Sequence, residues 1–263
     1  MSWELAGKTL KSRLLLGTAR YPSLHILKEA IKASRTEVLT IALRRQATNL
    51  EASMDFWNVI KELDCHLLPN TAGCQTAKEA IMIAEMAKEV FNTHWLKLEI
   101  TTDNYLLQPH PFELVTAAKE LISQGFEVFP YCSDDLAVCE RLVELGCRIL
   151  MPWGSPIGSG KGLTNLFALR TLRQRLPTTT LIVDAGIGAP SHAAKALEIG
   201  FDGVLLNSAV ALANDPIKMA SGFAAGLEAG RLAFEAGLMP ERDFATPSTP
   251  VIGKPFWHQV NHV

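Results

Sequence analysis

Short apolar runs alternate along the chain with longer amphipathic segments. Eight of the runs predict β-strands, at residues 13–17, 37–43, 66–70, 94–100, 126–131, 147–152, 179–186 and 202–207. Helical patterns fill the gaps, as in the segment Thr76–Phe91, where small and aliphatic residues recur on one stripe. Strands that alternate with such helices predict parallel βαβ units. Eight consecutive units favour an α/β fold with a single (β/α)8 TIM barrel, and an open doubly wound sheet is the alternative.

The length of 263 residues suits one barrel, because such domains commonly run to about 250 residues. No low-complexity stretch divides the series of predicted units. We therefore expect a catalytic barrel domain over residues 1–237. The remaining segment, 238–263, contains Pro247, Pro250 and Pro255 and is expected to be a C-terminal tail that is flexible or packs on a partner.

The predicted strand 94–100 carries two charged residues, Lys97 and Glu99. Because side chains alternate between the two faces of a strand, its aliphatic residues share the face toward the helices. Lys97 and Glu99 then point into the barrel, toward the C-terminal mouth where barrel enzymes keep their chemistry. Burial lowers the pKa of a lysine and a neighbouring carboxylate raises it, and a partly neutral amine can attack a carbonyl group. A purely structural internal ion pair is the alternative for this strand.

Polar and small residues follow three of the later strands. Asp184 and Gly186 lie at the end of the seventh predicted strand, and Asn207 and Ser208 follow the eighth, where both could act as helix N-caps. Loops after these two strands commonly bind a phosphate in TIM barrels, so we expect a phosphate site there. The loop after the sixth strand is rich in glycine and serine, but Ser155 occupies the position where a P-loop needs its first glycine. Ordinary turn chemistry is the alternative for the loops after the seventh and eighth strands, and a mobile surface loop is the alternative for the loop after the sixth.

Composition and charge narrow the class of protein. The chain is 48% hydrophobic and 20% charged, with 25 Lys and Arg against 27 Asp and Glu, so no strong charge favours nucleic acid or a membrane. No segment reaches the roughly 20 apolar residues of a membrane span, and we expect a cytoplasmic protein. The five cysteines form no C-x-x-C pair and no metal-ligand cluster is evident. We expect buried reduced thiols and no metal site.

Six ordered blocks carry a resemblance to a known family. They read "LTIALRR", "LLPNTAGC", "WLKLEI", "MPWGSPIGSG", "IVDAGIGAPSHAAKALEIG" and "VLLNSAVA". Together they resemble the thiazole synthases of thiamine biosynthesis, from about Leu5 to about Gly237. The resemblance implies a TIM-barrel transferase without a cofactor. Such an enzyme condenses 1-deoxy-D-xylulose 5-phosphate, dehydroglycine and sulfur into the thiazole phosphate precursor of thiamine, and the sulfur arrives as the C-terminal thiocarboxylate of a small carrier protein.

The same resemblance implies roles for individual residues. Lys97 would form a Schiff base with the sugar ketone, and Glu99 and Asp184 would move protons. The residues implied to contact the sugar phosphate are Gly158, Ala185, Gly186, Asn207 and Ser208. Because Glu99 lies close to Lys97 in sequence, we expect it also to influence the Lys97 pKa, which would make Asp184→Asn the cleaner test of proton transfer. A homo-oligomer, dimer or tetramer, is also expected.

Two departures from the family pattern stand out. Ser208 occupies a position where the family commonly has threonine, although the hydroxyl is kept. The segment "TTDNYLLQPHPFEL" differs from the usual "LLPD" form. The alternatives that remain open are a Schiff-base phosphosugar aldolase on the same fold and a non-catalytic barrel that binds a phosphosugar.

Overall fold

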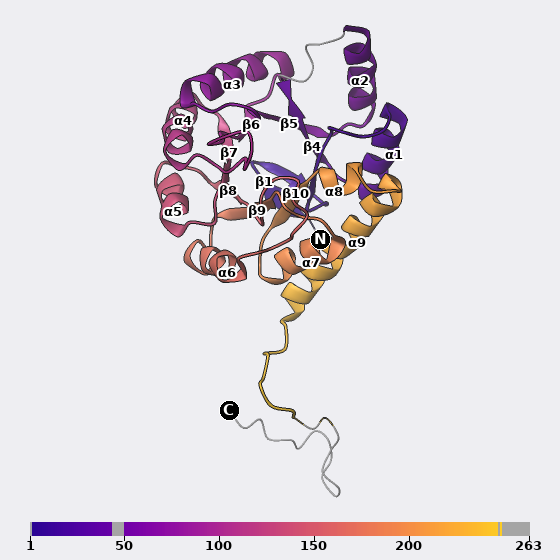
Figure 1. The fold of residues 1–263 in the computed structure, drawn as a ribbon, viewed down its shortest axis with the longest axis vertical. Helices are drawn as coiled ribbons and strands as arrows, with labels where there is room; N and C mark the ends of the chain where they lie inside the picture. Colours follow the sequence, from indigo (N-terminus) through magenta and orange to yellow (C-terminus); the bar gives the residue numbers. More distant parts are fainter. Residues whose placement is uncertain (1, 44–49, 247, 249–263) are drawn as a thin grey trace, which may run out of the picture.

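The computed structural model describes residues 2–43, 50–246 and 248. Eight parallel strands close into a barrel in the order β10-β3-β4-β5-β6-β7-β8-β9 (Figure 1). These strands are β3 (Leu14–Gly17), β4 (Val38–Ala42), β5 (His66–Asn70), β6 (Trp95–Leu98), β7 (Glu127–Cys132), β8 (Ile149–Pro152), β9 (Thr180–Asp184) and β10 (Gly203–Leu206). Each lies within or overlaps one predicted strand. The (β/α)8 barrel is confirmed, and the pairing of β10 with β3 rules out an open sheet.

Helices surround the barrel as an outer ring (Figure 1). They are α1 (Leu24–Ser34), α2 (Leu50–Glu62), α3 (Ala77–Phe91), α4 (Pro111–Ser123), α5 (Leu136–Glu144), α6 (Leu166–Arg175), α7 (Pro190–Glu198), α8 (Ser208–Ala211) and α9 (Pro216–Ala236). Several start at capping side chains: Ser23, Thr76 and Asp135 each accept a hydrogen bond from a backbone N–H in the first turn. Local sequence thus fixes where the helices begin.

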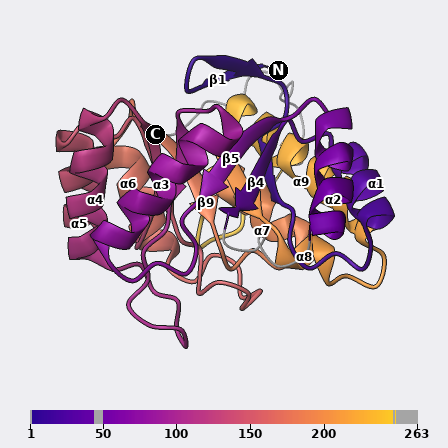
Figure 2. The same ribbon diagram turned by 90° about the horizontal axis from the view of Figure 1, so that it is seen from above.

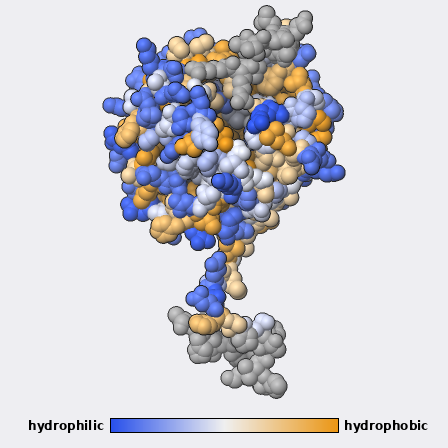
Figure 3. Space-filling model, in the orientation of Figure 1, coloured by the Kyte–Doolittle hydropathy of each residue, from blue (hydrophilic) through white to orange (hydrophobic). Residues whose placement is uncertain are grey.

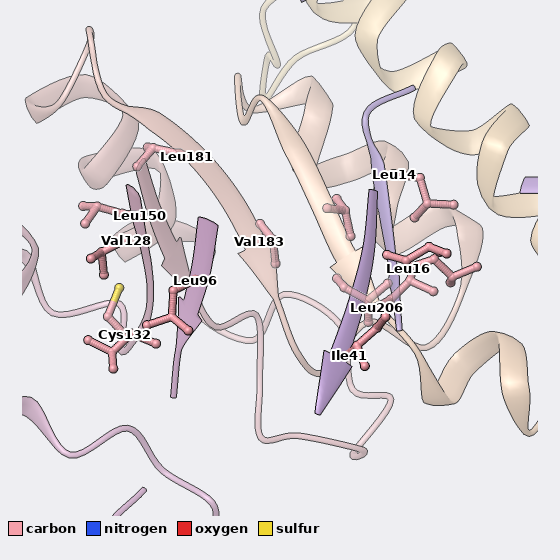
Figure 4. Close-up of a cluster of buried hydrophobic side chains, with 14 of the residues drawn as sticks. Leu14, Leu16, Ile41, Leu96, Val128, Cys132, Leu150, Leu181, Val183 and Leu206 are labelled. Carbon is pink, nitrogen blue, oxygen red and sulfur yellow. The ribbon is translucent and has the colours of Figure 1, made fainter. Parts of the chain in front are cut away.

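The strand side chains alternate between two apolar layers. Leu14, Leu16 and Leu96 belong to the layer between strands and helices (Figure 4). Leu15 and Trp95, their neighbours in sequence, belong to a second cluster inside the barrel. This alternation is the one predicted for β6, and it places Lys97 and Glu99 on the interior face.

A hairpin that the sequence pattern did not reveal precedes the barrel. Its strands, β1 (Trp3–Leu5) and β2 (Lys8–Leu10), pair antiparallel. Trp3, Leu5 and Leu10 are buried in the same cluster as the interior residues of the barrel. Figure 2 shows the hairpin on the side opposite the long loops that follow β6 and β8. The hairpin therefore covers the amino-terminal end of the strands and leaves the other end for the site.

The last helix, α9, ends at Ala236, one residue before the expected end of the barrel domain. That boundary stays a prediction, because residues 249–263 of the expected tail lie outside the described residues. On the face shown in Figure 3, hydrophobic and hydrophilic residues are interspersed. Within the described ranges, no helix combines the length and apolar character that a membrane span requires.

Candidate active site

Lys97, Glu99 and Asp184 meet inside the barrel. The Lys97 Nζ atom lies 2.6 Å from Asp184 Oδ2 and 3.5 Å from Glu99 Oε2. The three side chains are 7%, 10% and 4% exposed for Lys97, Glu99 and Asp184. The predicted convergence of these residues is therefore present in the structure, with one cation between two carboxylates.

The strand ends hold this cluster in place. Glu99 lies just beyond β6, and the Thr71 hydroxyl donates to the Glu99 carbonyl and accepts from the Glu99 N–H, both at 2.8 Å. Asp184 is the last residue of β9 and pairs with Leu205 on β10. Asn70, at the end of β5, pairs with Lys97, and its amide donates to the Thr40 hydroxyl at 3.0 Å. On the other side of β6, Lys97 pairs with Phe129 on β7. Strand pairing thus fixes the backbone on both sides of the lysine.

The charge state of Lys97 differs from the expected partly neutral amine. Burial lowers the Lys97 pKa, but the Asp184 and Glu99 carboxylates together outweigh burial and raise this pKa above its ordinary value. Burial also raises the Asp184 pKa, and the nearby Lys97 ammonium opposes this only in part. Lys97 therefore holds its proton more tightly than an exposed lysine does, and Asp184 takes up a proton more readily than an exposed carboxylate does.

The nearer carboxylate is Asp184, although Glu99 is closer to Lys97 in sequence. The two distances, 2.6 Å and 3.5 Å, show that Asp184 makes the tighter ion pair. The expectation that Asp184→Asn would disturb Lys97 less than a change at Glu99 is therefore wrong. Barrel closure places Asp184, at the end of β9, across the interior from Lys97 on β6, and no spacing in the sequence reports that distance.

Tyr131, on β7, is a site residue that the sequence did not single out. It is fully buried, and the Lys97 Nζ atom lies 5.6 Å from the centre of its ring. Burial raises the pKa of the phenol, and the charges of Asp184 and Glu99 raise it further, so the hydroxyl stays protonated. The run "FEVFPY" reads as an ordinary apolar strand. In the sequence, only the alternation of side chains along this strand, with every second residue facing inward, could have indicated that Tyr131 lies inside the barrel.

The glycine-rich loop after β8 packs on the loop after β9. The Gly162 N–H donates to the Gly186 carbonyl at 2.8 Å, and the Ser155 hydroxyl contacts the same carbonyl at 3.3 Å. A β-carbon at Gly186 would lie 1.9 Å from Ser155 Oγ, so no larger residue fits there. Ala185 and Gly186 both have left-handed backbones, with φ of 73° and 76°. This strained turn immediately follows Asp184.

The remaining residues implied to contact the sugar phosphate are spread over two loops. Asn207 stands at the N-cap position of α8, but it makes no side-chain capping bond. Instead its side chain packs on Gly17, where a β-carbon would come within 2.5 Å of Asn207 Cβ. Asn207 Oδ1 is buried without a hydrogen-bond partner among the described residues. Ser208 begins α8, and Gly158 is exposed in the loop after β8, with φ of 74°.

A metal centre finds no support in the described part of the chain. No group of three or more His, Cys, Asp or Glu side chains there could hold an ion. Four of the five cysteines are buried, and Cys65 is half-buried. The arrangement is instead that of a buried amine with two acid–base groups, which suits covalent chemistry on a carbonyl compound.

Comparisons with known proteins identify the family of the chain. The family described as "Thiazole biosynthesis protein ThiG" matches residues 4–250. The chain is 58% identical to the thiazole synthase of Coxiella burnetii (strain RSA 493 / Nine Mile phase I) over 254 residues, which cover 97% of this chain and 98% of the relative.

Solved structures show the same fold. A chain of the Amycolatopsis orientalis BexX/CysO complex superposes with a TM-score of 0.82 at 29% identity, covering 91% of this chain and 97% of that one. A 4-hydroxy-2-oxoglutarate aldolase superposes with a TM-score of 0.55 at 18% identity, covering 82% and 94%, and this likeness concerns the fold alone. With the family match extending over nearly its whole length, the chain belongs to the thiazole synthase family of thiamine biosynthesis.

Proposed function

We propose that this protein condenses 1-deoxy-D-xylulose 5-phosphate, dehydroglycine and a carrier-borne sulfur atom into a thiazole phosphate, through a Schiff base on Lys97. The observation that carries the proposal is the buried amine of Lys97, 2.6 Å from one carboxylate and 3.5 Å from another. The match to the thiazole biosynthesis family supports the choice of substrates. The residue roles rest on the geometry.

The first step requires Lys97 to lose a proton, and Asp184 is placed to accept it. Its carboxylate lies at hydrogen-bonding distance from Nζ, and its raised pKa favours the protonated acid. The freed amine then attacks the sugar ketone to give a carbinolamine. Protonation of the carbinolamine hydroxyl, with Asp184 as the acid, expels water and leaves the iminium ion. The proton that Asp184 takes from the ammonium is thus returned to the leaving oxygen.

Glu99 suits the later proton transfers. It belongs to the same buried cluster but lies farther from the amine, so it can remove a proton from the carbon next to the imine while Lys97 stays bound to the substrate. This transfer moves the carbonyl character along the sugar chain and opens the position that receives sulfur. Two carboxylates at unequal distances thus support two different steps.

For the phosphate, we propose the loops after β9 and β10. The left-handed turn at Ala185 and Gly186 and the start of α8 at Ser208 lie next to Asp184 and Asn207 at neighbouring strand ends. Glycine lets the backbone approach an anion, and a hydroxyl and backbone N–H groups can donate to it. Gly158 would contribute from the loop after β8, which packs against this turn.

The sulfur donor is proposed to be a separate carrier protein with a C-terminal thiocarboxylate. The similar Amycolatopsis orientalis structure contains a second protein, CysO, which supports a protein partner for the barrel. A protein-bound thiocarboxylate can reach the interior only as an extended chain threaded through the mouth.

We further propose that the protein is a homo-oligomer and that it is located in the cytoplasm.

A complex with the carrier should be detectable by gel filtration. Mixed at micromolar concentrations, enzyme and carrier are expected to co-elute, with the enzyme itself running as a dimer or tetramer. Truncation of the carrier's last residues should weaken the complex, because the threaded tail then no longer enters the mouth. A monomer that never co-elutes with the intact carrier would contradict both proposals.

The cysteines of the enzyme are not needed for sulfur transfer on this account. Cys132 is fully buried in the layer between strands and helices, with its Sγ atom 3.8 Å from the Sγ atom of Cys139, and the contact with Cys139 and burial raise its pKa. Cys132→Ala should keep the rate of thiazole formation within about threefold of wild type. Removing the buried sulfur should lower the free energy of unfolding by about 1 kcal/mol. A folded variant without sulfur incorporation would show that the thiol takes part.

Reconstitution separates the proposed function from its alternatives. The protein is incubated with the sugar phosphate, dehydroglycine and thiocarboxylated carrier, and the products are identified by mass spectrometry. Thiazole phosphate is the expected product. Cleavage of the sugar phosphate into two smaller carbonyl compounds would indicate an aldolase, and binding without any turnover would indicate a non-catalytic barrel.

A further inference from the structure

Tyr131 occupies the interior of the barrel at the level of the reactive lysine. Phe129, two residues earlier on β7, belongs to the interior cluster, whereas Val128 and Cys132 belong to the outer layer. Tyr131 therefore faces inward by the same alternation that orients Lys97. Its side chain is fully buried.

The Lys97 amine has two carboxylates and one aromatic ring as close neighbours. Asp184 and Glu99 contact it as carboxylates, and the ring of Tyr131 lies 5.6 Å from the Nζ atom. The face of an aromatic ring attracts a cation, most strongly where water is excluded. The ring also occupies space into which the flexible lysine side chain could otherwise turn away from the carboxylates.

The hydroxyl of Tyr131 has a separate contact. It donates to the Leu107 carbonyl at 3.4 Å, which is long for an O–H donor. Leu107 lies in the 101–110 segment, where its backbone is left-handed with φ of 51°. The weak bond and the strained acceptor suggest that this contact contributes little to the position of the ring, which the surrounding core fixes.

We infer that Tyr131 is a positioning residue for the imine step, whose ring confines the Lys97 amine beside Asp184 and in line with the incoming carbonyl. This inference rests on the proposed function and adds a residue to it. Its physical basis is that small displacements of a nucleophile from the productive geometry cost large factors in rate. The aromatic ring of Tyr131 confines the amine, and the hydroxyl is not needed for this step.

Two substitutions separate the ring from the hydroxyl. Tyr131→Phe keeps the ring and should form the reduced Lys97 adduct within about threefold of the wild-type rate at saturating sugar phosphate. Tyr131→Leu removes the ring and should slow adduct formation by about tenfold or more, with little change in the sugar phosphate concentration that gives half the maximal rate. Tyr131→Met replaces the leucine variant if the latter does not fold.

Phe129→Leu serves as the matched control. It removes an aromatic ring from the same strand, and the ring packs on Trp95 at 5.5 Å rather than on the amine. This variant should lose stability but form the adduct at the wild-type rate.

The outcomes separate the role of Tyr131 from the Schiff-base proposal. A folded leucine or methionine variant that forms the adduct as fast as wild type would overturn the role of Tyr131. So would a phenylalanine variant as slow as the leucine variant. If the wild-type protein forms no adduct at all, the Schiff-base proposal itself fails.

Discussion

Lys97→Arg is expected to abolish thiazole formation and to leave the barrel folded. Arginine keeps the positive charge that Asp184 and Glu99 require, so the buried carboxylates are not left unpaired. The guanidinium group does not lose its proton at accessible pH and cannot attack a ketone. The rate should fall by about a thousandfold or more, because the covalent route is lost. Product is measured by mass spectrometry, and folding by circular dichroism and thermal unfolding.

Lys28→Arg is the matched control for this substitution. Lys28 pairs with Glu62 on the helical surface, far in the fold from the interior cluster. The same exchange there should leave both the rate and the unfolding temperature close to wild type. If Lys97→Arg kept more than about a tenth of the wild-type rate, a Schiff base on Lys97 could not be the main route.

Asp184→Asn is expected to change how adduct formation depends on pH. In the wild type, Lys97 passes its proton to Asp184, so the fraction of reactive amine is set by an internal equilibrium. The rate should therefore be nearly flat in the pH range between the raised pKa of Asp184 and the raised pKa of Lys97. Without the Asp184 carboxylate, the proton must leave to solvent.

The variant's rate should then rise with pH, by about tenfold per unit while the amine remains mostly protonated. Loss of one carboxylate also lowers the Lys97 pKa, so the rise should level off at high pH. At neutral pH thiazole formation should fall by about a hundred- to ten-thousandfold. The measurement is the initial rate of adduct trapping with cyanoborohydride across the pH range.

Glu99→Gln provides the comparison. Because Glu99 is the farther carboxylate, this variant should keep a flat pH profile for trapping and lose mainly the later steps. A wild-type rate that already climbs tenfold per pH unit would show that Lys97 releases its proton to solvent, and the role given to Asp184 would be wrong. An Asp184→Asn variant that traps substrate like the wild type and also makes normal amounts of thiazole would likewise contradict the role given to Asp184.

The barrel could be predicted because its signal is local and repeated. Each strand is a short apolar run, each helix has its own stripe, and the inward direction of Lys97 follows from alternation along a single strand. The β1 and β2 hairpin escaped prediction because its strands have three residues each and each includes a charged residue, Glu4 in β1 and Lys8 in β2. Its burial depends on the open end of a barrel formed by distant residues.

The meeting of Lys97, Glu99 and Asp184 could be predicted from the sequence, but the distances between them could not. Lys97 and Asp184 are 87 positions apart in the sequence numbering, and only closure of the barrel places them 2.6 Å apart. The balance between burial and two carboxylates, which keeps Lys97 charged, also depends on those distances. Tyr131 lies in an apolar strand between Pro130 and Cys132, so its approach to the lysine emerges only from the three-dimensional arrangement of β6 and β7.

The central claim is that Lys97 forms a Schiff base with the sugar phosphate. The wild-type protein is incubated with 1-deoxy-D-xylulose 5-phosphate alone, reduced with borohydride and digested, and the modified peptide is sequenced by tandem mass spectrometry. The account predicts one stable adduct, located on Lys97, whose mass corresponds to the sugar phosphate joined through a reduced imine. An adduct on a different lysine, or no adduct from a preparation that makes thiazole, would contradict it.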